Sequence, residues 1–289
     1  MTADDVLAEL DSEALAALVK DVGIPPRPSL LADLQDEVQR DEPRMRVMAD
    51  IAGSDVAMSA ALLKTANSPM MGLRKRAETV QDAFMLLGYT QCHVILTEIS
   101  LRELLPMDGP AMTRYWDVST KRARAMTYLA RQKRMSTPAL AHTLGLFVDV
   151  GIPLLMRRFH RTEANYVDTL ALANQSGVPF TTIERERHKT DHALVGSMVA
   201  RTWGVSQTVL LATRLHHDYD GWTSEVPACV LQLMALCLVS ETIIQRYAGL
   251  NVHAEWDKGG ALAMKLLGLD DAMLDEWCDE VHDRFNEAG

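Results

Sequence analysis

Apolar residues recur along most of the chain three or four positions apart, which is the spacing of one face of an amphipathic helix. Val and Ile rarely alternate with polar residues, so signals for β-strands are weak throughout. The pattern predicts a first helix over residues 3–21, ended by Gly23. Its apolar stripe consists of Leu7, Leu10, Leu15, Leu18 and Val19. The chain is therefore predicted to be all-α.

Proline, glycine and capping residues divide the next part of the chain into several helices. The prolines of residues 24–28 predict an extended segment, because proline has no amide donor and biases the preceding residue away from helix. Thr79 and Asp82 have the spacing of a capping box, and Gly88 ends the helix that they begin. The predicted helices span residues 29–40, 44–52, 55–66, 79–87 and 90–105.

The turn-forming stretch Pro106–Pro110 is the best candidate for a domain boundary. We expect an N-terminal helical bundle over residues 1–105, packed on a second helical bundle over residues 106–289. A turn at Ser176–Pro179 separates two helices of the second bundle. The helices predicted there span residues 111–134, 138–159, 162–176, 191–202, 206–218, 226–248, 257–267 and 270–287.

Length and composition bound the class of protein. A chain of 289 residues with 48% hydrophobic residues can bury a sizeable core. Mean hydropathy is −0.04, and no apolar run approaches the roughly 18 residues of a spanning helix, so we expect a soluble protein without a membrane partner. The acidic N-terminus differs from the basic start of a secretory signal, and we expect a cytoplasmic location.

The cysteines and the glycine motifs argue against several kinds of site. None of the four cysteines belongs to a Cys-x-x-Cys pair, so buried free thiols in a reducing compartment fit better than zinc or disulfides. Gly-x-Ser-x-Gly and the glycine-rich phosphate loops are absent, and we expect no cofactor. The cysteines are Cys92, Cys229, Cys237 and Cys278.

The net charge of −10 argues against broad nucleic-acid binding, which depends on neutralising phosphates with Lys and Arg. One basic stretch runs from Lys121 to Arg134 and includes Arg122, Arg124 and Lys133. We interpret it as the solvated face of a helix. The alternative is a patch for an acidic partner or a nucleotide.

Asp149 is the first candidate for chemistry. It lies in an apolar stretch, where an unpaired carboxylate is expensive to bury. It either caps the turn made by Gly151 and Pro153 or serves as a cation ligand, and for the residue taken alone we favour the cap. Its flanking residues are Phe147, Val148, Val150 and Ile152.

Three histidines are the other candidates. His192 follows Asp191, which we interpret as the N-cap of a helix. His216 and His217 end another predicted helix, and neighbouring side chains there point about 100° apart. Polar caps explain this doublet about as well as metal ligation does. Because all the candidates lie at the ends of amphipathic segments, they can converge in the core of a helical bundle.

These motifs together resemble the HDOD family, the HD-related output domains of bacterial signalling proteins. The resemblance runs from Ile24 to about Tyr247, and its most specific motif is Leu62–Ser68, close to the family's Leu-Leu-(Arg/Lys)-x-Ala-Asn-Ser. The further matches are Ile24–Pro28, Ile51–Ser59, Val80–Gly88, Tyr115–Ser119, Gly145–Gly151, Glu184 with His192 and Gly196, Trp203–Val205 and His216–His217.

The resemblance implies that the second bundle is a degenerate HD phosphohydrolase. Active HD enzymes carry histidines where Val118 and Val148 stand, and a later aspartate of that superfamily falls near Ser240–Glu241, where none occurs. With these ligands missing, no metal is expected, and any metal would use Asp149 and the three histidines. The implied pseudo-active-site pocket consists of Asp149, His192, His216, His217 and Glu184.

The resemblance also implies a non-catalytic signalling module rather than an enzyme. It would associate with protein partners from bacterial kinase or cyclic-dinucleotide pathways. One alternative is a residual metal-dependent phosphohydrolase in which Glu184, Glu186 or His188 replaces the lost ligands. The other is a nucleotide-binding sensor in which Arg185 or Arg187 grips phosphate.

Overall fold

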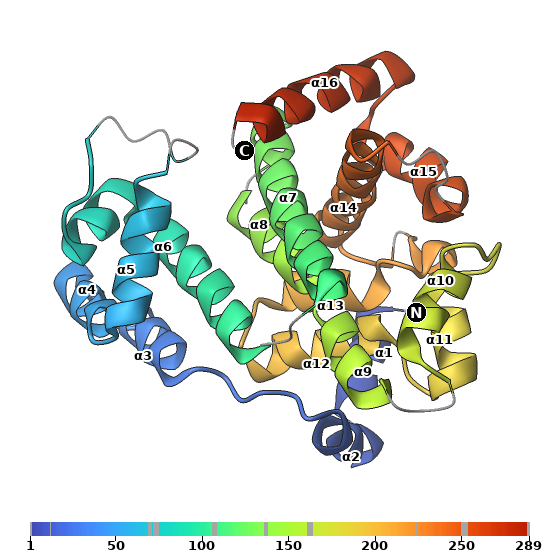
Figure 1. Ribbon diagram of the computed structural model, residues 1–289, viewed down its shortest axis with the longest axis horizontal. Helices are drawn as coiled ribbons and strands as arrows, with labels where there is room; N and C mark the ends of the chain where they lie inside the picture. Colours follow the sequence, from blue (N-terminus) through green and yellow to red (C-terminus); the bar gives the residue numbers. More distant parts are fainter. Residues whose placement is uncertain are drawn as a thin grey trace. The chain divides into compact units, whose positions relative to one another are not determined.

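The described part of the chain consists of helices joined by turns and short connections, with no strand among those residues (Figure 1). The prediction of an all-α fold is therefore confirmed. The computed structural model describes residues 2–11, 13–68, 71, 75–105, 109–135, 138–160, 164–223, 225–249 and 254–287.

Two compact units divide the chain. The small unit comprises Pro26–Pro106, and the large unit comprises Met1–Pro25 together with Met107–Glu287. The predicted N-terminal bundle over residues 1–105 therefore differs from the structure at its start, since the first 25 residues belong to the large unit. They do so because their apolar face is buried there, with Val6 fully buried. Of the predicted boundary stretch Pro106–Pro110, residues 106–108 lie outside the described residues.

In the described residues of the small unit there are four α-helices, two of which begin at a side-chain cap. Asp55 accepts a hydrogen bond from the amide of Met58 and caps α5. Thr79 and Asp82 form the predicted capping box, and Gly88, with φ of 78°, interrupts α6. The helices are α3 (Ser29–Val38), α4 (Met45–Gly53), α5 (Val56–Ala66) and α6 (Val80–Leu104).

Asn67 explains the most specific motif of the small unit in structural terms. Its side-chain amide donates to the carbonyl of Ala77 at 2.8 Å, and its side-chain oxygen accepts from the amide of Ala77 at 2.8 Å. Ala77 is buried, so both of its backbone groups depend on this one side chain. Asn67 therefore fixes the two ends of the connection between α5 and α6.

The large unit has more helices than the pattern predicts. The predicted helix 3–21 is two helices, the predicted helix 138–159 is broken by a turn at residues 148–150, and α11 lies where none was predicted. Its helices are α1 (Ala3–Leu10), α2 (Glu13–Val22), α7 (Pro110–Gln132), α8 (Pro138–Phe147), α9 (Gly151–Phe159), α10 (Tyr166–Ala173), α11 (Phe180–His188), α12 (His192–Thr202), α13 (Gln207–Leu215), α14 (Ala228–Tyr247), α15 (Ala254–Leu267) and α16 (Asp271–Glu287).

Two stretches of the large unit are long and apolar enough to cross a membrane by length and composition, namely Pro138–Phe159 and Ala228–Tyr247. The expectation that no such stretch exists was therefore too strong. In the most apolar windows of the two stretches, 67% and 72% of the residues are buried inside the fold. Buried core helices pass the same test, so the two stretches are weak signs of a membrane segment.

Part of the basic stretch is more buried than predicted, and one of the four cysteines is more exposed. Arg122 is almost fully buried, and Lys121 and Lys133 lie over the rings of Tyr247 and Trp277, so this stretch is only partly a solvated face. Three of the cysteines are buried free thiols as expected, and the exposed one is Cys229.

We predict that Asn67→Ala destabilises the small unit by about 1–3 kcal/mol, because it leaves the two backbone groups of Ala77 buried without partners. Hydrogen exchange of α5 and α6 measures this local stability. Asn174→Ala is the matched control, since its side chain donates one exposed bond to Leu170. Equal exchange in the two variants would contradict the assigned role.

Candidate functional site

The turn between α8 and α9, the helices α11 and α12, and the end of α13 bring the predicted site residues together in the large unit. The turn between α8 and α9 supplies Asp149, the middle of α11 supplies Glu184, and the start of α12 supplies His192. The end of α13 supplies His216 and His217. All five predicted pocket residues therefore lie in one neighbourhood.

Gly151 allows the turn carrying Asp149 to approach α12 closely. A Cβ atom built on Gly151 would lie 2.2 Å from the carbonyl oxygen of His192. Gly145 plays the same part on α8, where a Cβ would lie 2.5 Å from the Cα of Ala123 on α7. Glycine is thus required at both positions to bring the backbone of the site into contact.

Glu184 orients His192. Its Oε2 lies 2.7 Å from Nδ1 of His192, and both side chains are fully or almost fully buried. A carboxylate accepts hydrogen bonds, so Nδ1 of His192 is the donor. The hydroxyl of Tyr166 donates to the other oxygen of Glu184 and fixes the carboxylate in turn.

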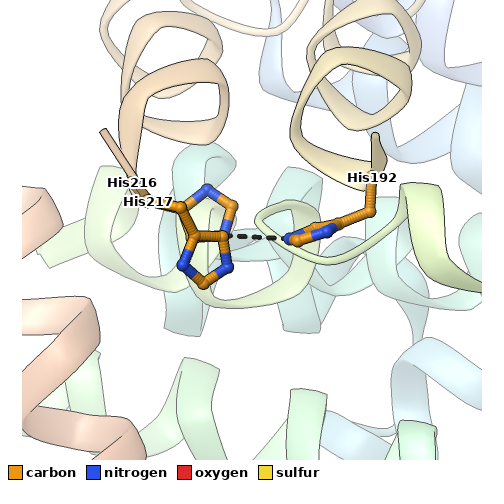
Figure 2. A group of neighbouring side chains, drawn as sticks. All are labelled: His192, His216 and His217. Atoms are coloured by element: carbon orange, nitrogen blue, oxygen red, sulfur yellow. Dashed lines mark hydrogen bonds between the residues drawn. The ribbon is translucent and has the colours of Figure 1, made fainter. Parts of the chain in front are cut away.

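His216 is oriented in the same way by the backbone. Its Nδ1 lies 2.8 Å from the carbonyl oxygen of Thr213, which can only accept, so Nδ1 donates. The Nε2 atoms of His192 and His216 therefore point inward and lie 3.2 Å apart (Figure 2). Oδ1 of Asp149 lies 3.5 Å from the first and 3.8 Å from the second.

Lone pairs of three atoms converge here, namely Nε2 of His192, Nε2 of His216 and Oδ1 of Asp149. Such an arrangement is stable only with a positive charge among them. A proton is one solution. Burial disfavours the imidazolium of His192, but Glu184, Asp149 and Asp191 outweigh it and raise the pKa of His192 to about 9. Burial, with His217 and His192 nearby, lowers the pKa of His216 well below its usual value. His192 then donates from Nε2 and His216 accepts.

A single metal ion is the other solution. Three donors placed about 2.1 Å from one ion lie roughly 3.0–3.5 Å from one another, close to the separations observed among Asp149, His192 and His216. Each imidazole also has its Nδ1 held by an acceptor, as metal-bound histidines almost always do. The donor set therefore fits one cation.

His217 is turned toward α15. Its Nδ1 lies 2.6 Å from Oε2 of Glu255, which also accepts from Tyr219 at 2.7 Å. Phe180 stacks on its ring at 5.4 Å between centroids. The possible ligand atoms of the three histidines lie within 4.8 Å of one another, so His217 can approach a cation as a further donor.

Arg122 supplies a permanent positive charge beside these residues. Its Nη1 donates to Oδ2 of Asp149 at 2.6 Å and to Oε1 of Glu241 at 2.9 Å, and the side chain is 1% exposed. Its Nε donates to the carbonyl of Gly145 at 3.1 Å. Burial raises the pKa of Asp149, but the charges of Arg122 and the two inward histidines outweigh it and hold that pKa far below its usual value.

Several predicted candidates lie elsewhere or have another role. The side chain of Asp149 makes no cap hydrogen bond to α9, so the favoured capping interpretation was wrong. His188 contacts Thr169 at 2.8 Å, and Glu186 is exposed. Arg185 is bonded to Asp191, which is the predicted N-cap of α12.

Arg187, the other arginine considered for phosphate, is bonded to Thr169. The residues that sequence reasoning did not assign to the site are Arg122, Glu241 and Glu255. One available signal was the position of Arg122 between inward-facing Ser119 and Ala123 on α7, where a solvated arginine is out of place.

Comparison with known proteins identifies the architecture. The model of the HDOD domain family matches residues 24–219. The chain is 25% identical over 145 residues to the uncharacterized protein YuxH of Bacillus subtilis (strain 168), covering 50% of this chain and 34% of that protein. It is 21% identical over 196 residues to an uncharacterized protein of Treponema pallidum (strain Nichols), covering 68% and 38%. The chain thus spans little more than a third of these relatives.

Solved structures share the fold at low identity. A "Putative phosphohydrolase" of Shewanella amazonensis SB2B has a TM-score of 0.70, 19% identity and 95% coverage of both chains. An HDOD domain protein of Geobacter sulfurreducens has a TM-score of 0.67 at 17% identity, covering 99% of this chain and 97% of that one. A "Putative signal transduction protein" of Marinobacter aquaeolei VT8 has a TM-score of 0.69 at 20% identity, covering 94% and 59%.

We predict that Gly151→Ala destabilises the large unit by about 1–3 kcal/mol, because the new methyl group overlaps the carbonyl of His192. Gly53→Ala is the matched control, since nothing lies within 4 Å of its added Cβ. Denaturant unfolding followed by circular dichroism compares the two. A Gly151→Ala protein as stable as Gly53→Ala would contradict the close approach.

We predict that His192 titrates near pH 9 in metal-free buffer. Because this pKa is raised above the unfolded value of about 6.5, its contribution to stability is complete below pH 6.5 and is lost as pH rises through 9. Glu184→Gln removes the largest of the charges that raise the pKa of His192 and moves the titration downward. NMR titration of the imidazole measures both, and an unchanged midpoint in the variant would contradict the assignment.

Proposed function

The chain belongs to the HDOD family, and from this premise we propose that it is a non-catalytic regulatory module of signal transduction that acts by associating with other proteins. The observation that carries the proposal is the buried ion pair of Arg122 with Asp149 and Glu241. The chain itself supplies the cation that pairs with both carboxylates. The pocket is then better suited to holding its helices together than to activating a water molecule.

Hydrolysis by a two-metal centre requires ligands for two ions about 3.5–4 Å apart. Oδ2 of Asp149 and Oε1 of Glu241 are both bound by Arg122, which leaves only Oδ1 of Asp149 facing the histidines. A second ion would have to displace a guanidinium that is 1% exposed. Displacement would leave an unpaired buried charge, which costs about 3–5 kcal/mol.

We propose that the partners are proteins of kinase or cyclic-dinucleotide signalling pathways. The sharing of the fold with the "Putative signal transduction protein" of Marinobacter aquaeolei supports a role in signal transduction. The nucleotide-sensor alternative has less support, because Arg185 and Arg187 are engaged with Asp191 and Thr169. These contacts hold the Nε side of each guanidinium within the chain.

A second candidate function is that of a phosphohydrolase with one metal ion. It is favoured by the convergence of Asp149, His192 and His216, whose inward atoms lie 3.2–3.8 Å apart. When bound, a divalent ion would supply Lewis-acid activation of water or a phosphoryl oxygen. Glu184 would orient His192 by accepting its Nδ1 proton, and the backbone of Thr213 would do the same for His216.

Metal content and turnover separate the two candidates. The wild type, Asp149→Asn and Asp117→Asn proteins are equilibrated with Mn²⁺ or Zn²⁺, and bound metal is measured by inductively coupled plasma mass spectrometry. Asp117 is the control because its carboxylate is 56% exposed on α7. Hydrolysis of bis(p-nitrophenyl) phosphate and of a cyclic dinucleotide is measured on the same samples.

We expect no more than one ion per chain and no hydrolysis above the level of Asp149→Asn, because Arg122 occupies the carboxylates of a second ion. Hydrolysis with one ion, lost in Asp149→Asn and kept in Asp117→Asn, would establish the second candidate instead. Two ions per chain with hydrolysis would refute the role assigned to Arg122.

A further inference from the structure

The N-terminal segment, residues 2–11 and 13–25, covers one surface of the large unit. α1 contacts α13, and α2 contacts α9. The segment carries its own apolar stripe into these contacts, where each side chain is at most 7% exposed. That stripe consists of Val6, Leu10, Leu15 and Val22. We call this part of the chain the latch segment.

A bidentate ion pair lies at the centre of the contact. Nε and Nη2 of Arg214 donate to the two carboxylate oxygens of Glu9 at 2.8 and 2.9 Å. Arg214 is 5% exposed and Glu9 is 34% exposed, so the pair is shielded on the arginine side. Paired N–H donors matched to a carboxylate make this the strongest polar contact of the latch segment.

Weaker contacts surround it. Arg158 binds both oxygens of Asp21 at 3.0 Å, and Arg201 is paired with Asp11. These pairs are largely exposed, so solvent screens them and each contributes little to stability. Nε1 of Trp203 donates to the carbonyl of Pro25 at 3.1 Å, which holds the end of the segment.

The chain after the segment can act as a tether. Gly23 has φ of 71° and ends α2, and residues 24–28 contain three prolines and no regular secondary structure. The segment therefore consists of two short helices, followed by a connection without helical hydrogen bonds. It can leave the surface without unwinding another element.

Removal of the segment would expose a defined surface. That surface combines the apolar area beneath α1 with the guanidinium of Arg214, flanked by Arg201 and Arg158. Exposing this apolar area to water is unfavourable, so the uncovered surface favours contact with another apolar face. The best-matched face would also bring a carboxylate to Arg214. An acidic amphipathic helix has this chemistry, and the chain's own α1 demonstrates the fit.

We propose that residues 2–25 form a displaceable latch over this surface, and that the occupant which replaces the latch is an acidic amphipathic helix of a protein partner. The proposal deepens the proposed association role and rests on it for the existence of a partner. Arg214 lies two residues before His216, and Arg201 lies on the helix that begins with His192. The latch therefore binds the two helices that carry the inward-facing imidazoles.

The test uses the full chain and weakens the latch in place. Glu9→Gln keeps the side-chain shape and removes the charge that binds Arg214, and Asp4→Asn is the matched control on the exposed side of α1. Hydrogen exchange is measured over residues 2–23, with α7 and α14 as internal references. A fluorescent peptide of residues 2–25 is then added to each protein, and its binding is followed by anisotropy.

We expect Glu9→Gln to raise exchange in residues 2–23 at least tenfold, with α7 and α14 unchanged. The peptide should bind this variant at least tenfold more tightly than it binds wild type or Asp4→Asn, and a peptide carrying the same Glu9→Gln change should not. Equal exchange in all proteins, faster exchange throughout the large unit, or no difference in peptide affinity would each overturn the latch. None of these outcomes depends on metal content or hydrolysis.

Discussion

A buried positive charge is what the centre of the large unit depends on. Asp149 presents one oxygen to Arg122 and the other to two imidazole nitrogens, so it needs a cation on both sides. Arg122 meets the first need permanently, because a guanidinium keeps its proton in a protein. The second need is met by a proton on His192 or by one divalent ion. The remaining contacts of the site serve to hold these partners at their distances.

The tautomers of the histidines follow from the acceptors that face their Nδ1 atoms. Each imidazole donates from Nδ1 to one acceptor. His192 donates to Glu184, His216 to the carbonyl of Thr213, and His217 to Glu255. Gly145 and Gly151 allow the segment that carries Asp149 to touch the backbones of α7 and α12, and so bring Asp149 to His192. The geometry of the pocket therefore depends on two close backbone contacts, each of which an added methyl group would disrupt.

The sequence predicted what local signals control. Thr79, Asp82 and Gly88 act as predicted, because caps and left-handed glycines are determined by a few neighbouring residues. α11 was not predicted because its inward side is polar: it buries Glu184 and His188, so hydrophobic periodicity cannot reveal it. Arg122 was interpreted as solvated because hydrophobic periodicity does not reveal a buried arginine either. Its burial depends on Glu241, 119 residues away, and no local pattern records that partner.

The location of the latch has a consequence for regulation. An effector that binds at one place influences another only if it prefers one of two arrangements of the elements that link them. Here α13 links the surface under the latch directly to the pocket. Arg214 binds Glu9, and His216, within one helical turn of it, contacts His192. If a partner that replaced α1 packed at a different angle or depth and moved α13, the distance between the two inward nitrogens would change with it. By reciprocity, a cation that fixed the distance between the two inward nitrogens would favour one position of α13. It would thereby change the affinity of the chain for the partner.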